Sequence, residues 1–138
     1  DGRDMIQRRQ LRDMDAREQT DRPTLWAKGS QEHEVIGELA PMDHELVIDK
    51  NASSPFNGTG IDQLLRNMGL ETLVMTGMAT DMCVETTARD AADRGYNVIV
   101  VEDAVATFFP EHHRTALSAL ARVYTQVWET DCVLNELQ

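Results

Sequence analysis

The chain has 138 residues, of which 41% are hydrophobic and 27% charged, a composition typical of a globular domain long enough to bury a core. Its net charge of -11 argues against nucleic acid or an anionic membrane as a partner, and no apolar run approaches the roughly 18 residues of a membrane span. Two cysteines provide no disulfide framework, which favours a reducing compartment and a cytoplasmic protein.

The first part of the chain predicts little regular structure. Residues 1–22 hold six arginines and six acidic residues that cancel in charge, so we expect a polar loop or a loosely held arm. A short helix is predicted over 32–39, stopped by Pro41.

From residue 45 onward, apolar runs alternate with helical patterns. Such alternation predicts βαβ units, hence an α/β fold in which helices cover both faces of a parallel sheet: a three-layer αβα sandwich, formed as a single domain over 1–138. The predicted strands cover 45–50, 71–78, 97–104 and 125–130, and the predicted helices cover 59–69, 82–94 and 110–124.

Local patterns support all three of these helices. Thr59 and Asp62 have the spacing of a capping box, and Gly69 and Gly95 are predicted helix stops. The predicted apolar face of helix 59–69 consists of Ile61, Leu64, Leu65 and Met68. That of helix 110–124 consists of Leu117, Leu120, Ala121 and Tyr124.

Cys83 is the first candidate for a functional residue. The segment TGMATDMCV (76–84) places it in the first turn of a helix, with Thr80 or Asp81 as the N-cap. Orphan N–H groups and the positive end of the helix dipole favour the thiolate there, and the same N–H groups could receive an oxyanion. The alternative is a buried cysteine of the core.

Lys50 is the second candidate, because it ends an apolar run where a lysine has little structural reason to lie. A lysine near a thiol stabilises thiolate and can transfer protons. The alternative is a solvated strand end.

Other residues give weaker signals. His112 and His113 are adjacent on a predicted helix, so we expect them to point to different faces and to make a poor metal pair. Cys132 is expected to be structural, and Asp103 to cap the helix that follows it. Neither a metal motif nor a glycine-rich phosphate loop is found, so no metal and no cofactor is expected.

Two segments together resemble the isochorismatase-like cysteine hydrolases, which include amidases. They are TGMATDMCVETTARDAADRGYNVIVVEDAVAT (76–107) and VIDKNASSPFNGTGIDQLLRNMG (47–69). The resemblance implies that Cys83 attacks an amide carbonyl and forms an acyl-thioester, while Lys50 assists its ionisation. It also implies a cis peptide bond between Met78 and Ala79, and an oxyanion hole made by the N–H groups of Ala79 and Cys83.

The loops look nearest to the branch that acts on biuret, triuret and ureidoacrylate, which implies a small, urea-like amide as substrate and a homodimer or homotetramer as assembly. A nicotinamidase-type amidase is the alternative within the family. The family's catalytic aspartate, at the end of its first strand, has no counterpart here, since the family's N-terminal strands are not found. We therefore expect either a piece of a longer hydrolase or a catalytically inactive binding or assembly member.

Overall fold

The computed structural model of the protein describes residues 29–138. The chain divides into two units, residues 1–52 and 53–138, and each is described by itself. The arm expected over 1–22 lies outside the described residues, and the expectation of a single domain stays a prediction. Within 29–138, no helix is both long enough and apolar enough to cross a membrane.

In the first unit, two 3-10 turns replace the helix predicted over 32–39. They are η1 (Gln31–His33) and η2 (Gly37–Leu39). Between them Ile36 adopts an extended ψ of 147°, which interrupts any run of helical hydrogen bonds. Gly37 adds to this, because glycine costs a helix about 1 kcal/mol relative to alanine. The prediction of one helix is therefore wrong.

The strand predicted over 45–50 does not form either. The side chains of Leu46 and Val47 are 63% and 66% exposed, and the segment pairs with no other among the residues the structure describes. Branched side chains favour a strand only where they pack on a sheet. Within residues 29–138, the segment 45–50 is not part of a sheet. Lys50 consequently lies at the end of an irregular segment, which corrects the prediction of four strands.

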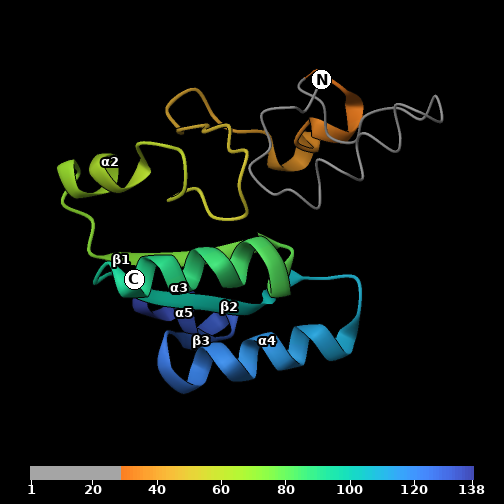
Figure 1. The fold of residues 1–138 in the computed structure, drawn as a ribbon, viewed down its shortest axis with the longest axis vertical. Helices are drawn as coiled ribbons and strands as arrows, with labels where there is room; N and C mark the ends of the chain where they lie inside the picture. Colours follow the sequence, from red (N-terminus) through yellow and green to blue (C-terminus); the bar gives the residue numbers. More distant parts are fainter. Residues whose placement is uncertain (1–28) are drawn as a thin grey trace. The chain divides into compact units, whose positions relative to one another are not determined.

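The second unit is a parallel three-stranded sheet with helices on both faces, as the sequence predicted (Figure 1). The strand order is β1-β2-β3, with β2 in the middle. The strands are β1 (Thr72–Met78), β2 (Asn97–Ala106) and β3 (Gln126–Trp128). The helices are α2 (Ile61–Asn67), the π-helical turn η3 (Thr80–Val84), α3 (Glu85–Asp93), α4 (Pro110–Val123) and α5 (Thr130–Glu136), the last of which the sequence analysis missed.

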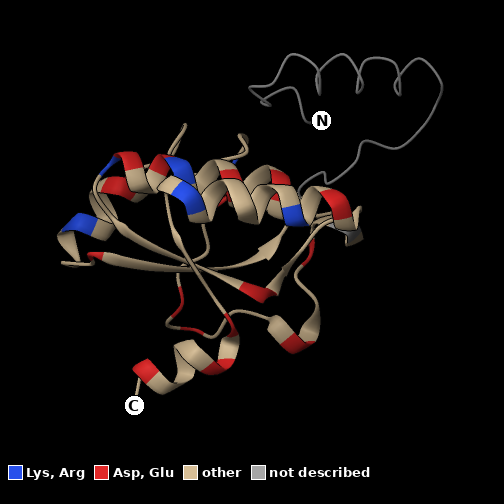
Figure 2. Ribbon diagram, turned by 90° about the horizontal axis from the view of Figure 1, so that it is seen from below, with Lys and Arg blue, Asp and Glu red and all other residues tan. Residues whose placement is uncertain are grey.

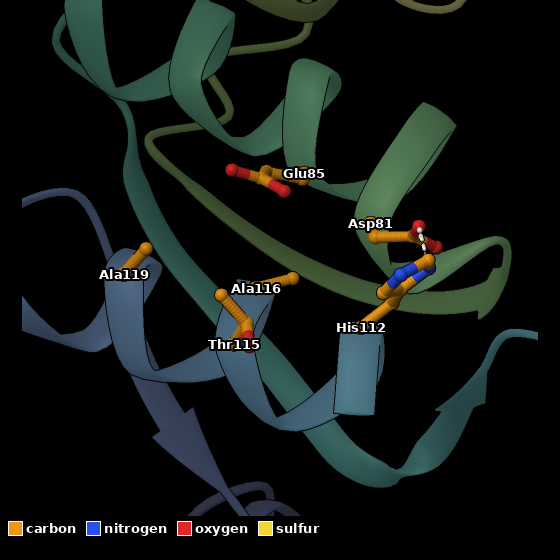
Figure 3. A pocket seen from close by; sticks show the side chains of 6 residues that line it. All are labelled: Asp81, Glu85, His112, Thr115, Ala116 and Ala119. Atoms are coloured by element: carbon orange, nitrogen blue, oxygen red, sulfur yellow. Dashed lines mark ion pairs between the residues drawn. The ribbon is translucent and has the colours of Figure 1, made fainter. Parts of the chain in front are cut away.

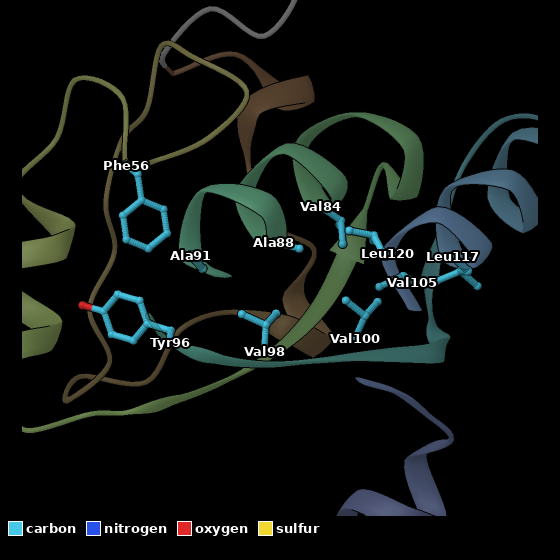
Figure 4. Close-up of a cluster of buried hydrophobic side chains, with 10 residues drawn as sticks. All are labelled: Phe56, Val84, Ala88, Ala91, Tyr96, Val98, Val100, Val105, Leu117 and Leu120. Carbon is cyan, nitrogen blue, oxygen red and sulfur yellow. The ribbon is translucent and has the colours of Figure 1, made fainter. Parts of the chain in front are cut away.

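Alternate residues of β2 define the three layers. Val98 and Val100 join the main core with Ala88 of α3 and Leu120 of α4 (Figure 4), whereas Ile99 packs in a smaller cluster on the opposite side of the sheet. That smaller cluster also contains Val101, Val133 of α5 and Trp128. Side chains alternate between the faces of a strand, so α3 and α4 cover one face and α5 the other. The expected three-layer αβα arrangement is confirmed.

Strand β1 departs from the expectation of a strand buried on both faces. Leu73 and Met75 pack against the main core, but Val74 points to the other face and is 45% exposed. Since β1 pairs with β2 alone among the described strands, it is an edge strand of this sheet.

A bulge interrupts the pairing of β1 with β2. Met75 is paired with Val100 and Gly77 with Val105, so β1 advances by two residues while β2 advances by five. The residues in excess include Asp103, which is exposed and turned out of the ladder. This bulge frees the Asp103 carboxylate for a contact outside the sheet.

Helix α2 begins without the capping box that the sequence suggested. The Thr59 hydroxyl accepts a hydrogen bond from the Ile61 N–H (3.3 Å), but Asp62 instead bonds to Tyr96 and Arg66. The glycine stops were predicted correctly: Gly69 and Gly95, which follow α2 and α3, have φ of 70° and 88°.

Acidic and basic residues occur together on α2, α3 and α4, whereas α5 has acidic residues alone (Figure 2). Ion pairs with i,i+4 spacing join Asp62 to Arg66, Glu85 to Arg89 and Asp90 to Arg94. The first is exposed and the other two are half-buried; because an i,i+4 pair on a helix contributes only about 0.3–0.5 kcal/mol, they add little to the packing of the layers.

Candidate active site

Cys83 lies in a turn that follows strand β1 directly. The strand ends at Met78, the peptide bond between Met78 and Ala79 is cis, and Ala79 is extended before the chain enters η3. We call residues 79–84 the cysteine turn. Cys83 is half-buried there, in the first helical turn, as the sequence predicted. The cis bond occurs where the family resemblance implied one.

The helix begins as a π-turn instead of an α-turn. The Val84 N–H bonds to the Ala79 carbonyl (3.1 Å), and the Glu85 N–H reaches the Thr80 carbonyl, so both bonds span five residues. Single π-turns of this kind are frequently found at functional sites. No side chain caps this helix, and the prediction that Thr80 or Asp81 is its N-cap is wrong.

Two threonines of α3 donate hydrogen bonds to backbone carbonyls of the cysteine turn. The Thr86 hydroxyl donates to the Met82 carbonyl (2.7 Å), and the Thr87 hydroxyl donates to the Cys83 carbonyl (2.6 Å). Both bonds reach back four residues, as threonine commonly does in helices. The carbonyl of Cys83 is therefore fixed by a side chain as well as by its position in the helix.

The side chains of Thr80 and Asp81 point toward the segment that follows β2. Thr80 Oγ1 lies 3.0 Å from His113 Nδ1. Asp81 accepts a hydrogen bond from Thr107 (2.5 Å), and its other oxygen lies 3.4 Å from His112 Nδ1. Figure 3 shows the His112 imidazole facing the Asp81 carboxylate.

Sequence reasoning missed these contacts. It considered His112 and His113 only as a metal pair, whereas both contact the cysteine turn, His112 at Asp81 and His113 at Thr80. One available signal was topological: adjacent parallel strands end at the same edge of a sheet, so the first turn of α4 lies near the turn after β1. Phe109 supports the arrangement, because its ring packs edge-on against His112 with centroids 5.3 Å apart.

A surface pocket of about 270 Å³ lies beside the cysteine turn, between α3 and α4 (Figure 3). Its walls are Asp81, Glu85, His112, Thr115, Ala116 and Ala119. Cys83 does not line this pocket. Moreover, Glu85 is already paired with Arg89 at 2.7 Å, and Asp81 with Thr107, so the carboxylates have partners within the protein. The pocket is a groove between α3 and α4.

Lys50 belongs to the first unit and Cys83 to the second. The ammonium group of Lys50 donates a hydrogen bond to the Ala52 carbonyl (3.0 Å), and Lys50 is exposed. The pairing of Lys50 with Cys83 therefore stays a prediction, as does the oxyanion hole made by the N–H groups of Ala79 and Cys83.

The remaining candidates resolve differently. Cys132 is exposed on α5, and neither Cys83 nor Cys132 forms a disulfide. The expectation that Cys132 is structural stays a prediction. Asp103 does cap a helix, but it is α5 and not the next helix along the chain: its carboxylate accepts from Thr130 N–H (2.8 Å) and the Thr130 hydroxyl (2.9 Å). Across residues 29–138, no group of three or more His, Cys, Asp or Glu side chains is arranged to hold a metal ion.

Comparison with known proteins gives a consistent result. The model of the isochorismatase domain matches residues 6–132. The chain is 36% identical to the ureidoacrylate amidohydrolase RutB of Acinetobacter baylyi over 83% of its length, and 40% identical to that of Methylobacterium radiotolerans over 81%. These matches cover 47% and 43% of the relatives, so the chain spans less than half the length of the curated relatives it matches.

Solved structures agree in fold. An isochorismatase family protein from Desulfovibrio vulgaris has a TM-score of 0.87 at 26% identity, with 99% of this chain and 69% of that one covered. N-carbamoylsarcosine amidase from Thermoplasma acidophilum has a TM-score of 0.71 at 38% identity, with 86% and 66% covered. Because the family model spans most of the chain and curated relatives are 36% and 40% identical to it, the protein belongs to the isochorismatase family.

Proposed function

We propose that the protein is a cysteine-dependent amidohydrolase that cleaves a C–N bond in a small, urea-like amide, with Cys83 as the nucleophile. The observation that carries this proposal is the position of Cys83 in a π-turn at the carboxyl end of β1, the end at which parallel sheets bind their ligands. The curated relatives are ureidoacrylate amidohydrolases, and one structural relative is an N-carbamoylsarcosine amidase, which supports an amide as the substrate.

The reaction has two steps. The Cys83 thiol loses its proton, and the thiolate attacks the carbonyl carbon. A C–S bond forms, the C–N bond breaks, and the departing nitrogen takes up the proton that the thiol released, to leave as ammonia or an amine. Water then attacks the acyl-thioester: its oxygen joins the carbonyl carbon, the C–S bond breaks, and the thiol is regenerated. The net change is the hydrolysis of one amide bond.

Two further roles belong to this proposal. The ammonium group of Lys50 favours the thiolate and stabilises the negative charge that develops on the substrate. The N–H groups of Ala79 and Cys83 bind the oxyanion of the tetrahedral intermediate, a kind of contact worth about 10²–10³ in kcat when one donor is lost.

Substitution of Cys83 in the full-length protein tests the proposal. The substrates are ureidoacrylate, biuret, triuret, N-carbamoylsarcosine and nicotinamide, with release of ammonia or loss of substrate as the readout. We expect Cys83→Ala to lower turnover by at least about a thousandfold while the thermal transition remains. Cys132→Ala, which removes the other thiol, should leave turnover intact. If Cys83→Ala retains a tenth of the activity, the nucleophile is misassigned.

Lys50 is tested by a matched pair of substitutions. Lys50→Met keeps the length of the side chain but removes its charge, so it should depress kcat and slow the alkylation of Cys83 by iodoacetamide. Lys50→Arg keeps the charge and should preserve more of the alkylation rate. An unchanged rate in Lys50→Met would show that this lysine does not act on the thiol.

The same labelling experiment decides whether the protein is instead an inactive binding or assembly member. An activated Cys83 should react faster than the exposed Cys132, although Cys83 is less accessible. Equal, slow labelling of both thiols, with none of the five substrates hydrolysed, would support the inactive alternative.

A further inference from the structure

The segment from Thr107 to His113 attaches to the cysteine turn at two successive residues. Thr107 donates to Asp81, and His113 meets Thr80 at 3.0 Å. Both contacts join parts of the chain that are far apart in sequence, by 26 and 33 residues. They connect the turn after β1 to the end of β2 and the first turn of α4.

The contact between Thr80 and His113 is partly buried. Thr80 is completely buried, and its hydroxyl has the imidazole of His113 as its partner. A buried hydroxyl that loses its partner destabilises the local structure, because water cannot replace the bond. Since Thr80 is the first residue of η3, any change in this contact acts directly on the start of the turn that carries Cys83.

The π-turn needs such restraints more than an α-turn does. Its wider hydrogen bonds, from Val84 to Ala79 and from Glu85 to Thr80, belong to a geometry that is rare and appears as single turns. A turn that relaxed to α-helical geometry would rotate Cys83 relative to β1. Side-chain contacts that hold Thr80 and Asp81 in place oppose this rotation.

We propose that His113 is a positioning residue for Cys83, acting through Thr80, with Thr107 and Asp81 as a second attachment of the same turn. The inference rests on the proposed function in one respect: it takes Cys83 to be the nucleophile. The effect of His113 on Cys83 passes through Thr80 and the backbone of the cysteine turn.

The experiment compares substitutions that remove the contact with substitutions that restore it, in the full-length protein. Thr80→Val removes the hydroxyl but keeps the shape, and Thr80→Ser keeps the hydroxyl. His113→Phe removes the ring nitrogens, and His113→Asn returns a polar group close to the place of Nδ1. Thr115→Val is the control, since Thr115 is an exposed threonine of α4 whose hydroxyl donates to the Glu111 carbonyl in the same helix (2.8 Å).

Two readouts separate positioning from general stability. The first is kcat, and the second is the rate at which iodoacetamide alkylates Cys83 without substrate, with Cys132 in each sample as the internal reference. We expect Thr80→Val and His113→Phe each to lower both rates about tenfold, the effect of losing one buried hydrogen bond, and to leave the Cys132 rate unchanged. Thr80→Ser and His113→Asn should recover most of the loss, and Thr115→Val should have no effect.

The double variant Thr80→Val/His113→Phe completes the test. If the two residues act as one unit, its loss should be no greater than that of the more affected single variant. The inference would be overturned if the losses of the two single variants multiplied in the double variant. It would also be overturned if the single variants lowered the melting temperature while kcat and the alkylation rate of Cys83 stayed unchanged. Should Thr80→Val fail to fold, the comparison of His113→Phe with His113→Asn decides alone.

These results remain distinct from a failure of the proposed function. Residual activity in Cys83→Ala would remove Cys83 as the nucleophile, whatever the Thr80 and His113 variants do. If Cys83→Ala is inactive while Thr80→Val and His113→Phe behave as wild type, only the positioning role fails.

Discussion

The hydroxyl of Tyr96 donates a hydrogen bond to Asp62 Oδ1 at 2.8 Å, across 34 residues of sequence. Tyr96 is nearly buried at the start of β2, and Asp62 belongs to the first turn of α2. Arg66 completes the group, because its guanidinium bonds to Asp62 (3.2 Å) and also lies over the Tyr96 ring. The relationship fixes α2 near the start of β2, at the end of the sheet opposite to the cysteine turn, since β2 starts where β1 starts.

Removing the Tyr96 hydroxyl should make the stability of the protein less dependent on pH in the acidic range. The hydrogen bond from Tyr96 is the main reason that the pKa of Asp62 is lowered; partial burial opposes the shift and Arg66 adds to it. A lowered pKa in the folded state means that Asp62 contributes stability above its unfolded pKa of about 3.9, and that this contribution is lost as pH falls through the folded value. Tyr96→Phe should therefore unfold at a lower temperature than wild type at pH 7, with the gap narrowing below about pH 4. A gap that is constant over this range would contradict the pairing.

Gly77 should resist substitution because of its backbone and not because of space. Its φ is 98°, at the bulge between β1 and β2, yet a Cβ added there would meet nothing within 4 Å. Gly77→Ala should thus cost about 1–2 kcal/mol from the left-handed conformation alone. Gly37→Ala is the matched control, with the same open space and no positive φ. Chemical denaturation measures both, and equal costs would show that backbone strain is not the reason for glycine at 77.

Asp103 should hold the N-terminus of α5. The hydroxyl of Thr130, followed by its N–H, lowers the pKa of Asp103, so the contact is strongest with the carboxylate charged and weakens as pH falls below about 4. Asp103→Ala should increase amide hydrogen exchange in α5, including at Val133, while Asp103→Asn keeps an acceptor and should lose less. Glu102→Ala, at the exposed neighbouring position, is the control and should leave exchange in α5 unchanged.

Leu120 should be the most sensitive position on α4. Its side chain is completely buried in the main core, where Val100 and Val84 also lie (Figure 4). Leu120→Ala should lower the free energy of unfolding by about 2–5 kcal/mol, because the lost contacts leave a cavity. Val123→Ala, on the same helix but 67% exposed, should change it by no more than about 0.5 kcal/mol. Similar effects at both positions would mean that α4 does not pack as described.

Sequence alone was enough for the local order of the second unit. Continuous apolar runs that end in turn residues predicted β1, β2 and β3, and the glycines at 69 and 95 predicted two helix ends, because these features depend on neighbours in the chain. The same local logic placed Cys83 in the first turn of a helix after β1. On α4 it identified Leu117 and Leu120 as core residues, although Ala116 is buried where Ala121 was expected.

Tertiary structure decided everything that needs a partner from elsewhere in the chain. Residues 45–50 have the composition of a strand but form none, because a strand exists only through hydrogen bonds to another strand. Asp103 contacts Thr130, and Thr80 contacts His113, because parallel strands bring distant segments to one edge of the sheet. The spacing of these residues in the sequence does not reveal which of them meet. The π-turn at Cys83 belongs to the same class: its hydrogen bonds are local, but the contacts that hold Thr80 and Asp81 in place come from the segment after β2.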